Sequence, residues 1–306
     1  MKLQQLRFVC EVARHGLSIS AAADALYTAQ PGVSNQIRLL EEELQVAIFV
    51  RHGKRLVGLT EPGQLILRMA EKILNEVDNI KRVSGEYAHE VTGRLTIATT
   101  HTQARYALPP VIKRFTTLYP TITLHIAQGS PTQIAEQVVS GKADLAIATE
   151  GLQLYDDLVM MACYDWNHCV IAPPDHPILG ETPLSLQTIA RYPLVTYDFA
   201  FTGRTKINQA FAAAGLEPNV VFTAIDSDVI KTYVELGLGI GLLAKMAFDP
   251  VRDSGLRAID VGHLFEPNTT RIGLRRGAYL RSYMYAFITL FAPHLTREVI
   301  HEALAG

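Results

Sequence analysis

Residues 18–44 read SISAAADALYTAQPGVSNQIRLLEEEL, and this stretch decides how the first part of the chain folds. Ser18 can cap a short alanine-rich helix, whose small side chains permit a close crossing with another helix. A turn at residues 27–29 follows, and Gln30-Pro31 then opens a further helix because proline suits the first helical turn. Apolar residues recur at helical spacing along that helix, at Val33, Ile37, Leu40 and Leu44.

The two flanking segments extend this pattern. An amphipathic helix is predicted upstream from the apolar residues Leu3, Leu6, Val9, Cys10 and Ala13. Downstream, IFVRHGKRLVGLT at residues 48–60 predicts a basic hairpin without acidic residues. Three short helices followed by such a hairpin indicate a winged helix-turn-helix. A generic three-helix bundle with a solvated charge run is the alternative interpretation.

The exposed face of the third helix carries amide, hydroxyl and guanidinium groups toward its N-terminal half. These groups bind base edges and phosphates, and a recognition helix reads bases with its N-terminal half. The sequence therefore predicts double-stranded DNA as a partner. The predicted DNA-contacting residues are Gln30, Pro31, Ser34, Asn35 and Arg38 on the helix and Arg51 and Lys54 on the wing.

Composition narrows the remaining possibilities. The 306 residues carry a net charge of −2, so DNA binding must rest on local patches rather than on overall charge. The three cysteines show no metal-type spacing, and their odd number fits a reducing cytoplasm. The N-terminus lacks a signal-peptide pattern and no apolar run approaches the ~20 residues of a membrane span, so no membrane partner is expected.

A long helix is predicted from Pro62 to about Glu90. Its apolar residues recur in steps of three and four, at Ile66, Met69, Ile73, Val77, Ile80, Val83 and Tyr87. We favour a dimerisation helix, because one recognition helix covers only a half-site. Packing of this stripe on the rest of the same chain is the alternative.

From Arg94 onward, strands and helices alternate in a β-α-β-α-β pattern, and a second such set begins near His168. The pattern predicts two α/β lobes, each with an open, mainly parallel sheet. The chain is expected to cross between lobes near residues 160–168 and to return near residues 269–276. Two crossings make a hinge, with a cleft between the lobes.

Polar residues gather where strands of these lobes end. One turn reads Thr99-Thr100-His101-Thr102-Gln103, another reads Phe201-Thr202-Gly203-Arg204, and a further strand ends at Thr149. Ligands of such folds bind beyond the carboxyl ends of the strands, near helix N-termini. Neutral donors of this kind can bind an oxyanion, although ordinary helix capping by threonine is the alternative.

Other chemistry has weaker support in the sequence. Gly237, Gly239 and Gly241 follow a predicted helix and precede a strand, the reverse of a dinucleotide-binding turn, so tight helix-to-strand packing is favoured. His168 between Cys163 and Cys169 is more typical of a core than of a metal site. No nucleophile and base can be placed together, so we predict no enzyme, no cofactor and no metal.

The first sixty residues resemble LysR-type regulators, through LRFVCEVARHGLSISAAADALYTAQPGVSNQIRLLEEELQVAIFVR and the following LTEPG. Asn35 departs from the family's usual Arg or Lys. Gln45 replaces a glycine that would take a left-handed turn without strain, a difference of about 1 kcal/mol.

The remaining chain resembles the LysR-type regulators of cysteine biosynthesis and sulfur assimilation, through TTHTQARYALP, QGSPTQIA, DLVMMACYDWN and TYVELGLGIGLLA. The resemblance implies a type II periplasmic-binding-protein fold, a homotetramer built as a dimer of dimers, and RNA polymerase as a partner. It also implies activation by N-acetylserine or O-acetylserine, opposed by sulfate or thiosulfate. The effector site it implies comprises Thr100, Thr102, Gln103, Thr149, Thr202 and Trp166.

Together, these patterns predict a DNA-binding domain at 1–60, a linker helix at 61–91 and an effector domain at 92–306. Lobe I would comprise residues 92–164 and 267–306, and lobe II residues 165–266. A sibling regulator of sulfonate use, which senses adenosine phosphosulfate, is one alternative. A solute-binding protein or a small-molecule enzyme on the same two-lobed fold is the alternative from another class.

Overall fold

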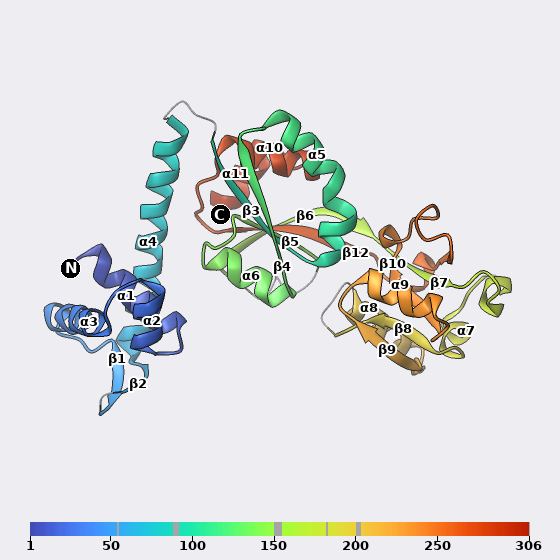
Figure 1. The fold of residues 1–306 in the computed structure, drawn as a ribbon, viewed down its shortest axis with the longest axis horizontal. Coiled ribbons are helices and arrows are strands. Elements are labelled where there is room, and N and C mark those ends of the chain that lie inside the picture. The colour runs from blue at the N-terminus through green and yellow to red at the C-terminus, as the bar shows by residue number, and fades with distance from the viewer. Residues whose placement is uncertain (54, 88–91, 150–154, 182, 200–202, 306) are drawn as a thin grey trace. The chain divides into compact units, whose positions relative to one another are not determined.

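The fold is taken from a computed structural model, which describes residues 1–53, 55–87, 92–149, 155–181, 183–199 and 203–305. Internal contacts divide the chain into two compact units, Met1–His89 and Glu90–Gly306 (Figure 1). Each unit is described by itself below.

The N-terminal unit contains the predicted helices α1 (Leu3–Arg14), α2 (Ile19–Ala25) and α3 (Gln30–Leu44). Ser18 caps α2, because its Oγ accepts a hydrogen bond from the amide of Ala21 at 3.2 Å. The small side chains of Ala22 and Ala23 are buried where α2 meets its neighbours. Val33, Ile37 and Leu40 of α3 are buried as predicted, and they share one core with α1. The helix-turn-helix is confirmed.

The wing and the long helix complete this unit. Strands β1 (Phe49–His52) and β2 (Arg55–Leu59) pair antiparallel and form the predicted hairpin. Helix α4 spans Glu61–Tyr87, so its predicted end near residue 90 lies outside the described residues. Ala70 of α4 is buried in the core of the unit, whereas Met69 and Ile80 are 61% and 68% exposed. Much of the α4 stripe is therefore uncovered within the N-terminal unit.

The second unit contains two five-stranded sheets. The first has the order β4-β3-β5-β12-β6, with the bounds β3 Gly93–Thr99, β4 Ile122–Gln128, β5 Leu145–Ala148, β6 Leu158–Trp166 and β12 Asn268–Arg275. Its helices are α5 (Leu108–Leu118), α6 (Pro131–Val139), α10 (Ser282–Phe291) and α11 (Arg297–Ala305). Helices α5 and α10 lie over one face of this sheet and α6 over the other (Figure 1).

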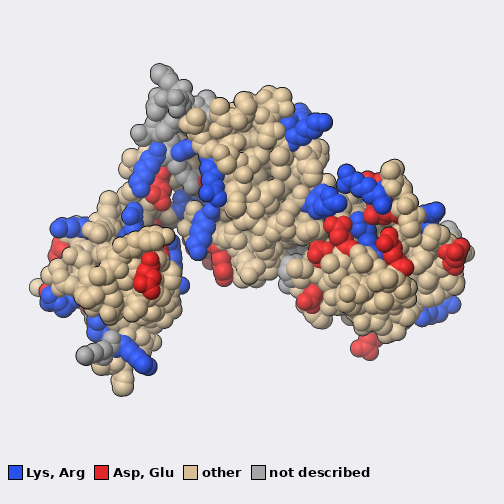
Figure 2. All heavy atoms as spheres, viewed as in Figure 1, with Lys and Arg blue, Asp and Glu red and all other residues tan. Residues whose placement is uncertain are grey.

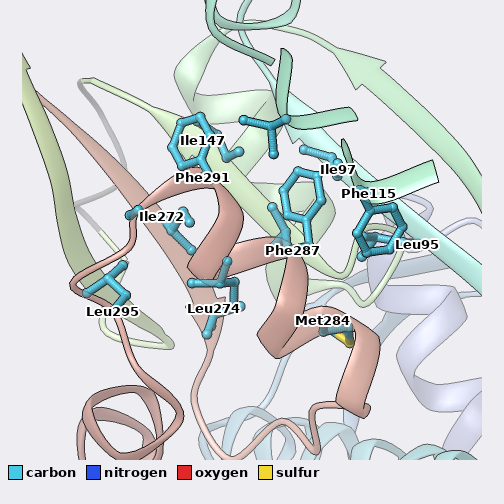
Figure 3. Close-up of a cluster of buried hydrophobic side chains, with 14 of the residues drawn as sticks. Leu95, Ile97, Phe115, Ile147, Ile272, Leu274, Met284, Phe287, Phe291 and Leu295 are labelled. Carbon is cyan, nitrogen blue, oxygen red and sulfur yellow. The ribbon is translucent and has the colours of Figure 1, made fainter. Parts of the chain in front are cut away.

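The core of the first lobe is aromatic and aliphatic. Figure 3 shows Phe287 and Phe291 of α10 pointing toward side chains of the sheet, including Ile97 and Ile147. Phe115 of α5 meets Phe287 edge to face, with 5.5 Å between the ring centroids. This packing fixes the first sheet against α5 and α10, and thereby the turn between β3 and α5.

The second sheet has the order β11-β7-β10-β8-β9, with the bounds β7 His168–Ala172, β8 Leu194–Tyr197, β9 Val220–Ala224, β10 Ile240–Ala244 and β11 Arg257–Asp260. Its helices are α7 (Leu186–Ala190), α8 (Arg204–Ala213) and α9 (Ser227–Glu235). Gly239 lies between α9 and β10, where an added Cβ would approach the carbonyl oxygen of Pro193 to 2.1 Å. Gly241 is equally close to its neighbours, since an added Cβ would lie 2.5 Å from the Ile171 side chain, so the prediction of tight packing holds for Gly239 and Gly241, whereas nothing lies within 4 Å of a Cβ added at Gly237.

The prediction of mainly parallel sheets was wrong in part. Each sheet has two parallel and two antiparallel strand pairings. In the second sheet the antiparallel pairings are those of β7 with β10 and β11. In the first sheet they are those of β12 with β5 and β6, and β6 and β12 also connect the two lobes. These two strands occupy the predicted crossings. Sequence reasoning missed the short elements α7, α11 and β11, of which β11 is the edge strand of the second sheet.

Candidate functional site

The turn after β3 carries the first group of predicted effector-binding residues. Thr99 is fully buried, and its hydroxyl donates to the carbonyl of Ile147 on β5 at 2.8 Å. Thr100 and Thr102 are 7% and 1% exposed. The chain then forms a π-helix at Gln103–Ala107 before α5 begins. π-helical turns are rare and occur frequently at functional sites, because they displace side chains from the regular helical positions.

Gln103 ties this turn to both connecting strands. Its Nε2 donates to Thr270 Oγ1 on β12 at 3.1 Å, and its Oε1 accepts from the Tyr164 hydroxyl on β6 at 2.5 Å. The carboxamide is therefore fixed, with a second Nε2 hydrogen that neither of these bonds uses. Sequence reasoning missed Tyr164 and Thr270, because a single polar residue on a strand carries no local signal.

Thr102 contacts the second lobe. Its hydroxyl hydrogen-bonds to the phenol of Tyr197 at the end of β8. The same phenol bonds to Ser227 Oγ at 2.6 Å and accepts from the amide of Ala244 at 3.2 Å. Burial raises the pKa of Tyr197, so the phenol stays protonated at neutral pH. A residue predicted to bind an anion thus already joins the two lobes.

Thr149 and Trp166 also come together. Trp166 Nε1 donates to Thr149 Oγ1 at 3.3 Å, and the indole is 7% exposed. The ring meets His168 edge to face at 5.2 Å. Thr202, the remaining predicted effector-binding residue, lies outside the described residues. The structure therefore brings Thr149 to Trp166 and Gln103 to the connecting strands.

A cluster of charges joins the lobes at a second place. Asp228 at the start of α9 accepts from Tyr106 at 2.6 Å and pairs with Arg105 at 3.4 Å and Lys231 at 3.2 Å. Burial raises the pKa of Asp228, but the hydrogen bonds from Tyr106 and Lys231 outweigh it, and the pKa lies below its ordinary value. Lys231 also binds Asp253 at 3.0 Å.

These charged residues line a cavity of about 580 Å³ between α5, α9 and the segment 246–253. Acidic and basic side chains lie close together on the second lobe, around α9, in Figure 2. Arg105 and Tyr106 of the first lobe contact Asp228 of the second, whereas Lys231 pairs with Asp228 and Asp253 within the second lobe.

The predicted recognition face is exposed. Gln30, Pro31, Asn35 and Arg38 are all accessible on α3, and Ser34 is half-buried. Asn35 Oδ1 accepts from Arg38 Nη2 at 3.0 Å, and Arg38 also pairs with Glu42. Asn35, which departs from the family pattern, therefore holds Arg38 in place.

Arg51, predicted to contact DNA, has a partner on α3. Its Nη2 pairs with Glu41 Oε2 at 3.0 Å, and Glu41 Oε1 accepts the amide of Ile48 at 2.9 Å. Arg51 thus connects the base of the wing to α3. A DNA phosphate that binds the Arg51 guanidinium would have to do so beside the Glu41 carboxylate. Lys54 lies outside the described residues.

All three cysteines are free and buried. Burial raises the pKa of the Cys10, Cys163 and Cys169 thiols to about 12, so each stays protonated at neutral pH. Within the described ranges, no group of three or more His, Cys, Asp or Glu side chains could hold a metal ion. No described helix is long and apolar enough to cross a membrane.

Comparison with family models agrees with this geometry. Residues 3–64 match the bacterial regulatory helix-turn-helix protein model of the lysR family, and residues 88–296 match the LysR substrate binding domain. The chain belongs to the LysR family. Its winged helix-turn-helix and two-lobed α/β unit are the two parts of a LysR-type regulator.

Relatives of this LysR-type chain extend over its whole length. It is 56% identical to the HTH-type transcriptional regulator CysB of Burkholderia cenocepacia over 100% of this chain and 98% of that protein. It is 54% identical to the regulator SsuR of the same organism, over 98% and 97% of the two chains. These named relatives are transcriptional regulators.

Solved structures show the same fold. The cofactor-binding domain of the Cbl transcriptional regulator is 44% identical, with a TM-score of 0.68 over 71% of this chain and 96% of that one. A full-length OxyR variant from Pseudomonas aeruginosa has a TM-score of 0.69 over 95% and 97% of the chains, at 20% identity. The second likeness concerns the fold alone.

Proposed function

We propose that this LysR-type chain regulates genes of cysteine biosynthesis and sulfate assimilation, in response to small molecules bound between its lobes. The effectors are N-acetylserine or O-acetylserine, and sulfate or thiosulfate. The observation that carries the proposal is the buried turn Thr100–Gln103, which offers hydroxyl and amide donors beside both connecting strands. The identity of 56% to a CysB regulator over the whole chain supports it.

Neutral donors suit a divalent oxyanion at this turn. Thr100, Thr102 and Gln103 lie at the carboxyl end of β3, where ligands of open α/β sheets bind. Thr149 follows β5 at the same edge of the sheet. Such donors bind an anion without the desolvation cost of burying a cation beside it. Thr202 and Trp166 belong to the same proposed site.

At its other end, the regulator binds double-stranded promoter DNA through α3 and the wing. We propose domain bounds of 1–60, 61–91 and 92–306, with α4 pairing two chains and two such dimers forming a tetramer. The exposed apolar residues of α4 support this pairing. The regulator would work in the cytoplasm with RNA polymerase and would not be an enzyme.

Two measurements test this function. A mobility-shift assay with cysteine-pathway promoter DNA should show binding at low salt, and its absence would refute the DNA-binding part. Calorimetry with N-acetylserine and sulfate should show binding of both to the full-length chain.

A second candidate function follows from the 54% identity to SsuR, which is close to the 56% to CysB. In that case the chain would regulate sulfonate use and respond to adenosine phosphosulfate. Titration of the same protein with adenosine phosphosulfate distinguishes the two candidate functions. Only a regulator of sulfonate use should bind adenosine phosphosulfate more tightly than N-acetylserine.

A further inference from the structure

Asn268 carries a buried side-chain amide without a hydrogen-bond partner among the described residues. The residue is 1% exposed, and neither Oδ1 nor Nδ2 of its side chain makes a hydrogen bond within the described part of the chain. A buried amide normally finds partners, because leaving it unpaired costs free energy. The amide orientation does not affect this observation, since both atoms lack a partner.

The position of Asn268 connects it to the proposed effector site. It opens β12, and its Cα partner on β6 is Trp166, which bonds to Thr149. Alternate residues of a strand face the same side, so Asn268 lies on the side of Thr270, which holds Gln103. Asn268 therefore belongs to the same face as the residues proposed to bind the effector.

The second lobe closes on the same side chain. Gly203 precedes α8 with a φ of 77°, and an added Cβ there would lie 2.7 Å from Asn268 Oδ1 and 2.8 Å from Nδ2. Only glycine fits this position, because of both its backbone conformation and its distance from the amide. The Asn268 amide thus lies between the connecting strands and the N-terminus of α8, where backbone N–H groups are exposed.

The chemistry of a carboxamide limits what can bind there. It offers one acceptor oxygen and two donor hydrogens. Sulfate has acceptors only, so it can satisfy Nδ2 but must leave Oδ1 without a donor. A secondary amide offers an N–H and a carbonyl together and satisfies both atoms.

We propose that Asn268 distinguishes the organic effector from the inorganic anion. It binds the secondary amide of a small N-acylated carboxylate, while the carboxylate of that ligand lies at the Thr100–Thr102 turn. This proposal rests on the proposed function, because it assumes that the cleft binds both kinds of ligand. N-acetylserine is the probe for the organic ligand.

The decisive variant is Asn268→Leu in the full-length chain, compared with wild type by calorimetry. Leucine has a similar shape but neither donates nor accepts. Loss of two hydrogen bonds should weaken N-acetylserine binding at least tenfold, and sulfate affinity should change less than twofold. Asn268→Asp is the matched polar variant. The negative charge of the aspartate should weaken binding of both N-acetylserine and sulfate, because both ligands are anionic.

The stability of the ligand-free protein provides a second readout. If the amide serves a ligand rather than the fold, Asn268→Leu removes an unpaired buried group and should raise the Tm by about 2–4 °C. A lower Tm for this variant would show that the amide holds a structural water and would overturn the proposal.

The binding data give the remaining outcomes. Equal N-acetylserine binding by wild type and Asn268→Leu would overturn the role of Asn268 and leave the proposed function intact. A wild-type protein that binds sulfate but not N-acetylserine would overturn both.

Discussion

Replacement of Thr102 by alanine tests whether its hydroxyl serves a ligand or only the contact between lobes. The side chain is 1% exposed, and its hydroxyl bonds to Tyr197 of the second lobe. Loss of this neutral bond should lower the free energy of unfolding by about 1 kcal/mol, and loss of the buried methyl by a further ~0.8 kcal/mol. A hydrogen bond to an ion contributes about 1.5–3 kcal/mol, so sulfate affinity should fall roughly 10- to 100-fold.

The two effects are measured separately. Calorimetry with sulfate gives the binding change, and thermal unfolding without ligand gives the stability change. Thr102→Ser keeps the hydroxyl and should bind sulfate within about threefold of wild type, although it also loses the methyl group. If Thr102→Ala is destabilised but binds sulfate as wild type does, the hydroxyl serves only the lobe contact. That result would remove Thr102 from the anion site.

The remaining predictions concern the charge cluster, the end of α3 and the thiols. The pKa of Asp228 is lowered, so its stabilising contacts are present near neutral pH and are lost as pH falls below about 4. Between pH 5 and pH 3 the free energy of unfolding should therefore fall less for Asp228→Asn than for wild type. The difference should be no more than about 1 kcal/mol, because the Asp228 side chain is 41% exposed. Gln45→Gly should raise the free energy of unfolding of the N-terminal unit by about 1 kcal/mol in urea titrations, since Gln45 has a φ of 54°, and Gln45→Ala should give no such gain. Ellman's reagent should label none of the three cysteines in native protein within minutes and all three in denaturant, and rapid native labelling would contradict their burial.

The N-terminal unit could be predicted closely because its signals are local. Ser18 as a cap, the spacing from Val33 to Leu40 and the turn at Gln45 each follow from neighbouring residues. Gln45 has the left-handed conformation expected at the position where LysR-type regulators usually carry glycine. Ala29, by contrast, caps α3 without a side-chain hydrogen bond.

The effector site could be predicted only in part, because its geometry depends on residues far apart in the chain. The threonines at residues 100 and 102 follow a strand and give a local signal. Asn268 and Thr270 join the candidate site only through the pairing of β12 with β6. Thr270 then bonds to Gln103, which lies 167 positions away in the sequence, so no local pattern could predict this contact. For Arg51 the local signal was incomplete. The basic residues around it predicted a contact with DNA, but in the structure its Nη2 also pairs with Glu41 Oε2 at 3.0 Å.

The bond between Thr102 and Tyr197 links ligand binding to the lobes. A threonine hydroxyl has one hydrogen, and the hydroxyl of Thr102 is hydrogen-bonded to the phenol of Tyr197. An anion that takes this hydrogen therefore competes with a contact between lobes. Tyr197→Phe removes the competitor, so sulfate affinity should rise, by about fivefold for one neutral hydrogen bond near 1 kcal/mol. The variant should also be less stable, because the amide of Ala244 and Ser227 lose their buried partner. Unchanged or weaker sulfate binding by folded Tyr197→Phe protein would show that the anion and Tyr197 do not compete for Thr102.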